Sequence, residues 1–294
     1  MLGYTLLAVV FVLDKRILTN EKQPPIVYTF YSSIFLLLVG LAWFFVPLSS
    51  DPKFWLVSVV SGLTFTLGLW AMFVAVSKSE ASHIDPFIGA VITTATFFSA
   101  RFFLNETLSL RQTAGIFLLI VASVFLAREK TQTNQMHWRW YGLGIIAGIL
   151  FAISNVSGKY LYDTFSFLPG LIGSKFTAGW FALLLLFFPT VRNIFFHPKK
   201  AKTIIAKHKQ PVGLVLVDKI LGVIAILLLQ WATAVGSVTA VNALAGLQYA
   251  LMFVIILILS KYGSKFLQEY MTKQEIVLQS FALLLVFVGL VLVI

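Results

Sequence analysis

Long runs of apolar residues, separated by short polar stretches, dominate this sequence. A helix that crosses about 30 Å of hydrocarbon needs about 20 residues, and ten runs approach that length. They cover approximately residues 1–20, 25–47, 54–77, 84–104, 109–127, 139–160, 167–188, 212–235, 239–260 and 274–294. The pattern therefore predicts an all-α membrane protein with ten transmembrane helices.

The two halves of the chain share a motif. Residues 103–112 read FLNETLSLRQ and residues 266–274 read FLQEYMTKQ, and each copy closes one apolar run and opens the next. Two more matches keep the register: Lys15 with Lys159, and Trp70 with Trp231. Repetition of a hydrophobic unit within one chain is typical of secondary transporters, whose substrate site lies between the repeats.

The repeat divides the chain into two five-helix units, residues 1–128 and 139–294, joined by a linker at 129–138. An odd number of spans in each unit places the units in opposite orientations across the bilayer. We therefore expect two inverted repeats around a central cavity. The motif copies also contain capping boxes, Ser109-x-x-Gln112 and Thr272-x-x-Glu275, which would satisfy free amides at the starts of two helices.

Composition excludes a water-soluble globule. Hydrophobic residues make up 59% of the 294 residues and charged residues 11%, with a mean hydropathy of +0.94, so the apolar surface exceeds what a soluble core could hide. The net charge of +11 does not indicate nucleic-acid binding, because the basic residues lie in short segments between apolar runs. The chain has no cysteine, and hence no disulfide or thiolate metal site.

The distribution of basic residues predicts an orientation. Loops after the odd-numbered runs hold 16 of the 22 lysines and arginines, so the positive-inside rule places these loops in the cytoplasm and both termini outside. The first run completes the repeat, and we therefore expect it to be retained rather than cleaved as a signal peptide. It begins at Met1 with almost no flank, so a few preceding residues are expected to be missing.

These residues resemble the EamA family of the drug/metabolite transporter superfamily. The resemblance rests on a Glu after the fourth and ninth runs (Glu106, Glu269), on the following Gln112 and Gly115, and on the small-residue run WATAVGSVTAVNALAGLQYAL. It implies a basket of ten helices in the cell membrane that exports or imports small metabolites by alternating access. The family usually has both termini inside, opposite to the charge count. The family's frequent proline in the middle of the fourth and ninth spans is absent here: Gln248 stands near that place in the second half, and Pro86 lies earlier in the fourth span than expected.

Three lysines within or beside the runs are candidates for binding an anionic group of a substrate. Lys15 and Lys159 are matched by the repeat, and Lys175, in SKFTAG, resembles a basic residue near the start of the family's seventh span. Charges at membrane depth are costly, so those that remain usually face a cavity or a partner. The alternative is that these long side chains reach the membrane interface from helix ends.

Asp218 is the candidate for proton coupling, since it is an acidic residue well inside a predicted span and can alternate between charged and neutral forms. Its neighbour Lys219 should point to another side of the helix and is not expected to neutralise it directly. The alternative for Asp218 is a structural ion pair with another helix. We expect Asp85 to cap the fourth helix.

Polar and aromatic residues inside the runs form a second set of candidates. Hydrogen bonds to a substrate are expected from Asn155, Gln230, Asn242, Gln248 and Tyr249, and walls of the cavity from Trp70 and Trp231. Helix-to-helix hydrogen bonding and ordinary packing are the alternatives.

No catalytic signature occurs in the chain: the sequence has no HExxH, G-x-S-x-G, P-loop or dinucleotide fingerprint. We therefore expect no enzyme activity and no cofactor. The favoured function is secondary transport of small organic metabolites such as amino acids, with the lipid bilayer and a small molecule as partners. A membrane scaffold and a subunit that translocates lipid-linked sugars remain the alternatives.

Overall fold

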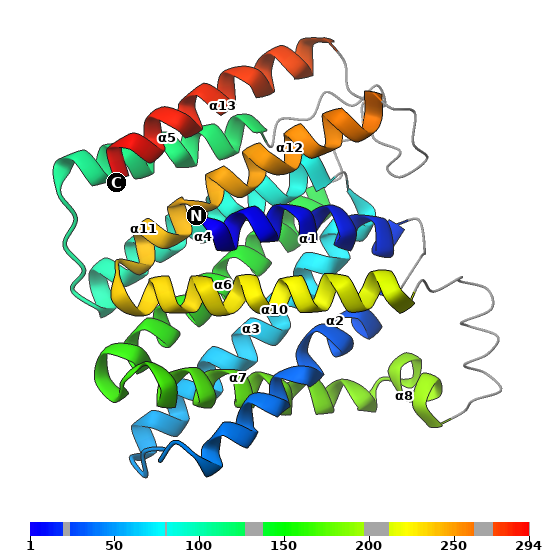
Figure 1. Ribbon diagram of the computed structural model, residues 1–294, viewed down its shortest axis with the longest axis vertical. Coiled ribbons are helices and arrows are strands. Elements are labelled where there is room, and N and C mark those ends of the chain that lie inside the picture. Colours follow the sequence, from blue (N-terminus) through cyan, green and yellow to red (C-terminus); the bar gives the residue numbers. More distant parts are fainter. Residues whose placement is uncertain (20–23, 80, 127–137, 197–211, 262–272, 294) are drawn as a thin grey trace.

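A computed structural model describes all residues except 20–23, 80, 127–137, 197–211, 262–272 and 294. The described part is helical throughout (Figure 1). Its helices are α1 (Leu2–Thr19), α2 (Pro25–Ile34), η1 (Phe35–Phe44), α3 (Pro52–Lys78), α4 (Ala81–Phe103), α5 (Leu110–Leu126), α6 (Trp138–Phe165), α7 (Phe167–Leu184), η2 (Leu185–Phe187), α8 (Pro189–Phe196), α10 (Val212–Val235), α11 (Val238–Ala243), α12 (Ala245–Lys261) and α13 (Lys273–Val293).

Polar residues with short side chains begin several of these helices. The Asp51 carboxylate caps α3 by accepting from the Lys53 amide at 2.8 Å, with Pro52 in the first turn. At α5 the predicted capping box is confirmed: the Gln112 amide donates to the Ser109 hydroxyl at 3.2 Å, and the Ser109 amide donates back to the Gln112 side chain at 3.1 Å. Thr272, in the second copy of the motif, lies outside the described residues.

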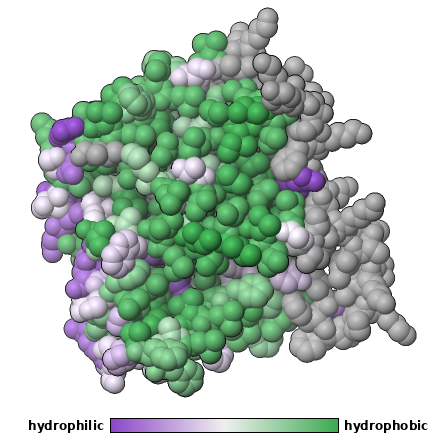
Figure 2. All heavy atoms as spheres, in the orientation of Figure 1, coloured by the Kyte–Doolittle hydropathy of each residue, from purple (hydrophilic) through white to green (hydrophobic). Residues whose placement is uncertain are grey.

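Apolar side chains cover the outside of the protein. Phe44, Phe45 and Leu110 are each at least 85% exposed, and Figure 2 shows hydrophobic residues across the middle of one face with hydrophilic residues along its left edge. Seven helices or continuous helix pairs of the described part are long and apolar enough to cross a membrane. Exposed apolar surface on this scale is stable only in lipid, and the chain is a multi-pass membrane protein.

The helices over three of the ten predicted runs fall outside that group of seven for identifiable reasons. Helices α5 and α13 are apolar but shorter within the described residues, at Leu110–Phe125 and Ser280–Val293. Helix α1 carries three charged residues, Asp14, Lys15 and Arg16, near its C-terminal end.

The helices pack around a centre that both halves of the chain supply. Helix α6 lies between α3 and α4, and α1 lies against α10 and α12, so the first helix of each half contacts helices of the other half (Figure 1). Helices α5 and α13 pair along one side. A reciprocal polar contact joins α3 to α6, where the Ser61 and Ser154 hydroxyls each donate to the other's carbonyl, at 3.1 and 2.9 Å.

Helices α3 and α7 approach each other at backbone distance. The Thr177 hydroxyl donates to the Ser58 carbonyl at 2.6 Å and the Thr66 hydroxyl to the Ala178 carbonyl at 3.1 Å. Gly62 permits this approach, because a Cβ at that position would lie 2.4 Å from the amide nitrogen of Ala178. Small residues at the crossing of two transmembrane helices are the usual means of such close packing.

We predict that Gly62→Ala destabilises the protein by about 1–3 kcal/mol, because the added methyl group meets backbone that cannot move independently of the helix. Gly142→Ala is the matched control, since nothing lies within 4 Å of a Cβ there, and it should leave stability equal or slightly higher. Thermal unfolding in detergent measures both variants. Equal midpoints for Gly62→Ala and wild type would show that α3 and α7 do not meet at this glycine.

The structure departs from the predicted elements in three places. The ninth run breaks at Leu244 into α11 and α12, and the second run continues from an α-helix into the 3₁₀ helix η1. Asp85 does not cap α4, which begins at Ala81; it lies inside the helix and is buried. The sequence prediction placed the start of the helix too late because Pro86 was expected in its first turn, whereas the helix accommodates this proline one turn later.

Glu269, which belongs to the second copy of the motif, lies outside the described residues.

Candidate functional site

A cavity lies between the two halves and consists of two adjoining chambers. The polar chamber has a volume of about 170 Å³ and the apolar chamber about 410 Å³. Both are bordered by the same apolar side chains, namely Leu7, Phe11, Phe65, Leu69, Met72 and Ile226. Because α1 and α3 come from the first half and α6, α10 and α12 from the second, neither half encloses the cavity alone.

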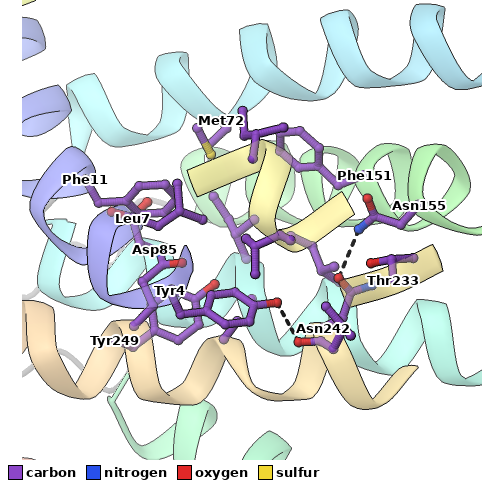
Figure 3. A pocket seen from close by; sticks show the side chains of 18 of the residues that line it. Tyr4, Leu7, Phe11, Met72, Asp85, Phe151, Asn155, Thr233, Asn242 and Tyr249 are labelled. Atoms are coloured by element: carbon purple, nitrogen blue, oxygen red, sulfur yellow. Dashed lines mark hydrogen bonds between the residues drawn. The ribbon is translucent and has the colours of Figure 1, made fainter. Parts of the chain in front are cut away.

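Two asparagines cross the polar chamber. Asn155 on α6 donates through Nδ2 to Oδ1 of Asn242 on α11 at 3.2 Å (Figure 3), and Nδ2 of Asn242 donates to the Thr96 hydroxyl at 3.0 Å. These two hydrogen bonds connect α6, α11 and α4 at the cavity wall. The amide pair can also exchange its mutual bond for bonds to a ligand, because each amide has both a donor and an acceptor.

The break between α11 and α12 opens backbone groups toward the same chamber. The Tyr4 hydroxyl on α1 donates to the Val241 carbonyl at 2.5 Å, and the Thr93 hydroxyl donates to the Asn242 carbonyl at 3.3 Å. A continuous helix would use these carbonyls internally. Discontinuous helices whose freed backbone groups line a cavity are a common feature of transporter substrate sites.

Gln248 and Tyr249 follow on α12. Gln248 is 2% exposed, and its Nε2 has no hydrogen-bond partner among the described residues. Tyr249 lies so close to α4 that a Cβ on Gly89 would clash with its ring, and Figure 3 places it beside Tyr4 and Asp85. A buried amide without a partner is costly unless a water or ligand bonds to it, so Gln248 is a donor available to a ligand.

Lys175 on α7 faces the apolar chamber. It is 4% exposed, and its ammonium lies 4.5 Å from the centre of the Phe65 ring. Within the described residues no carboxylate lies at ion-pair distance from it. A ring face offsets only part of the cost of burying an ammonium group. An anionic group in the chamber would complete this site.

An acidic cluster occupies another wall of the apolar chamber, where α1, α2 and α10 meet. The Tyr28 phenol oxygen is hydrogen-bonded to Oδ1 of Asp14 and lies 2.7 Å from Oδ2 of Asp218. The Lys219 ammonium lies 2.8 Å from Oδ2 of Asp218 and 3.5 Å from Oδ1 of Asp14, over the face of the Tyr28 ring. Asp218 is fully buried.

This geometry corrects the expectation that Lys219 does not neutralise Asp218. The two Cβ atoms do leave the helix in different directions, but the four-carbon lysine stem is long enough to turn its ammonium back onto the carboxylate. Asp14, which the sequence analysis passed over, belongs to the same cluster. Its position beside Lys15 and Arg16 near a helix end resembles an interfacial residue, although it is only 5% exposed.

Comparison with known proteins finds a matching family model and a similar solved structure. Residues 1–128 match the model of the EamA-like transporter family, part of the drug/metabolite transporter superfamily. Among solved structures, one described only as a crystal structure of a protein resembles 99% of this chain and 96% of its own, with a TM-score of 0.60 and 17% sequence identity. That likeness shows the fold alone. No curated protein matches the sequence.

Seven predicted site residues lie at the cavity. Asn155, Gln230, Asn242, Gln248 and Tyr249 line the polar chamber, and Lys175 and Asp218 line the apolar chamber. Gln230 additionally accepts from the Tyr162 hydroxyl at 2.7 Å. Tyr4, Asp14, Asp85 and Thr233 also line the cavity without having been singled out as site residues. Tyr4 and Thr233 give no signal in a single sequence, since nothing marks the face of the helix that they occupy.

The structure places the matched lysines outside both chambers. Lys15 donates to the carbonyls of Val76, at 3.1 Å, and Ser79, at the C-terminal end of α3. Lys159 donates to the Ala234 carbonyl at the C-terminal end of α10, at 3.2 Å, and pairs with Asp163. Each ammonium thus neutralises the negative end of a helix.

The matched tryptophans also lie away from the chambers. Trp70 packs on Phe188 and Trp231 on Phe167, with ring centres 5.5 and 5.0 Å apart. Trp231 is 55% exposed on the outer surface of α10. The two tryptophans therefore pack against other aromatic side chains instead of lining the cavity.

Proposed function

We propose that this protein is a secondary transporter that exports or imports a small organic molecule with an anionic group, such as an amino acid or a related carboxylate, by alternating access. The observation that carries the proposal is a cavity between the two halves in which polar groups from both halves converge. The second half supplies the amides of Asn155, Gln230, Asn242 and Gln248 and the Lys175 ammonium, and the first half supplies Tyr4 and Asp85. A membrane scaffold would have a centre filled by apolar side chains instead.

Ten membrane-crossing helices in two inverted repeats provide the framework of this proposal. A helix lies over each of the ten predicted runs. Contacts between the halves are consistent with this framework, since α6 packs on α3 as α1 packs on α10. The equivalent roles of Lys15 at the end of α3 and Lys159 at the end of α10 support the same relation.

Two interfaces that the repeat makes equivalent differ in the structure. The pairing of α3 with α7 corresponds to the pairing of α10 with α2. Helices α3 and α7 are in close backbone contact around Gly62, whereas α2 and α10 hardly touch and the apolar chamber lies between them. Figure 1 shows α2 running obliquely away from α10. One closed and one open interface is the asymmetry that alternating access requires, with the opposite arrangement as the second state.

The substrate chemistry follows from the two chambers. An anionic group fits opposite Lys175, an apolar body fits among the side chains of the apolar chamber, and polar groups fit the amides at Asn155, Asn242 and Gln248. Purified protein in liposomes, screened with labelled amino acids, monocarboxylates and nucleotide sugars with and without a proton gradient, tests this. We expect uptake of a carboxylate-bearing solute. Uptake confined to neutral solutes, or no uptake above protein-free liposomes, would contradict the proposal.

Asp218 is the proposed coupling residue. Burial of its ionised form is costly, so protonation changes the free-energy difference between the two states of the transporter. We predict that Asp218→Asn, which resembles the neutral form, abolishes accumulation driven by a proton gradient while exchange of internal for external substrate continues. Liposome assays of accumulation and of exchange measure the two activities separately. Normal pH-dependent accumulation by this variant would reduce Asp218 to a structural role.

A further inference from the structure

The cluster of Asp14, Tyr28, Asp218 and Lys219 contains more acceptors than its own protons can serve. A hydrogen bond needs one proton between its two heavy atoms. The Tyr28 phenol has one proton, yet its oxygen is within hydrogen-bond distance of two carboxylate oxygens. With both carboxylates ionised, one of these contacts would set a lone pair against a lone pair.

Charge leads to the same requirement. Two ionised carboxylates and one ammonium leave a net charge of −1 at a place where Asp14 is 5%, Tyr28 1% and Asp218 0% exposed. One additional proton makes the cluster neutral. It also supplies the missing donor, because the protonated carboxyl group donates to the phenol oxygen while the phenol donates to the other carboxylate. The ammonium, 2.8 Å from Asp218 and 3.5 Å from Asp14, remains shared between them.

We propose that Asp14 and Asp218 together bind a single proton, held as a carboxyl–phenol–carboxylate chain through Tyr28 with Lys219 as the counter-ion. The proton belongs to the pair rather than to either residue, as in other closely coupled carboxylates. The role of this proton in coupling rests on the transport function proposed above. The existence of the shared proton depends only on the geometry and burial of the cluster.

Other ionisable groups near the cluster are accounted for. Lys15, next to Asp14 on α1, directs its ammonium to the carbonyls of Val76 and Ser79. Tyr31 on α2 and Lys175 on α7 line the same chamber. Among the described residues no carboxylate lies within ion-pair distance of Lys175, so its ammonium does not neutralise the cluster by direct contact.

The position of the cluster gives the proton a mechanical effect. Tyr28 and Asp218 join α2 to α10, two helices that otherwise hardly touch. Loss of the proton leaves one carboxylate without its donor and weakens this link. Protonation of the pair therefore favours the state in which α2 and α10 are joined at Tyr28.

Infrared difference spectroscopy between acidic and alkaline pH tests the proton directly, in the full-length protein and without any substrate. Wild type should show the C=O stretch of one carboxylic acid that disappears as pH rises. Asp14→Asn and Asp218→Asn should each lose this band completely, because either variant leaves one carboxylate balanced by Lys219. Asp163→Asn, which changes an exposed carboxylate paired with Lys159, should retain the band.

The outcomes separate this inference from the transport proposal. A wild-type protein without the band, or a band that survives in either variant of the pair, overturns the shared proton whatever the protein transports. If one variant fails to fold, the other carries the test, since each removes half of the same pair. A band that behaves as expected in a protein that transports no carboxylate would retain the proton site and reject the substrate class.

Discussion

Replacement of Lys175 by methionine should strongly impair transport and at the same time stabilise the protein. The two effects have one cause: Lys175 is 4% exposed, and its ammonium has no anionic partner within the described residues. In the empty transporter its burial is a cost, and with substrate bound it becomes half of an ion pair. Methionine keeps the length and apolar stem of the side chain and removes only the charge.

The sizes of both effects can be estimated. Loss of one member of a buried charge pair typically costs 2–5 kcal/mol, so substrate affinity should fall about 30-fold or more. Removal of a buried, incompletely satisfied charge should stabilise the empty protein by about 1–3 kcal/mol, and the unfolding midpoint should rise by about 2–4 °C per kcal/mol. Liposome uptake and thermal unfolding in detergent measure the two effects.

Lys53→Met is the matched control for this experiment. Lys53 lies exposed in the first turn of α3, away from both chambers, so the same chemical change there should leave uptake and stability close to wild type. A Lys175→Met protein that is less stable than wild type would mean that the ammonium has a partner in the empty protein. Unchanged uptake would remove Lys175 from the substrate site.

Much of the fold was predictable because transmembrane helices obey strict length and hydropathy rules. Each predicted run contains a helix, and the Ser109 capping box forms as its spacing indicates. The sequence did not predict the break at Leu244. A helix interruption inside an apolar run is stable only where other helices supply donors to the freed carbonyls, as the Tyr4 and Thr93 hydroxyls do here.

The candidate site was predictable in residue type but not in residue direction. Polar residues deep in the runs, such as Asn155 and Asn242, do face the cavity, since membrane burial leaves them few other places. Residues matched between the two halves of the sequence were a weaker guide to the substrate site, because Lys15 and Lys159 both donate to carbonyls at the C-terminal ends of helices. The pairing of Asp14 with Asp218 joins two helices far apart in the sequence and follows from packing alone.

Alternating access makes a specific demand on the closed interface between α3 and α7: it must open during each transport cycle. Because the chain has no cysteine, a pair introduced at Ser58 and Thr177 would be the only thiols present. These residues face each other across the interface, where the Thr177 hydroxyl donates to the Ser58 carbonyl at 2.6 Å. A disulfide between them would hold the interface shut.

The most direct test of the account is transport by this double-cysteine protein in liposomes before oxidation, after oxidation and after reduction. Alternating access predicts normal uptake in the reduced protein, near-complete loss of uptake once the disulfide has formed, and recovery of uptake on reduction. The variants with cysteine at Ser58 alone or at Thr177 alone should be insensitive to the oxidant. Full transport by a protein shown to be completely cross-linked would contradict the account, because α3 and α7 would then never need to separate.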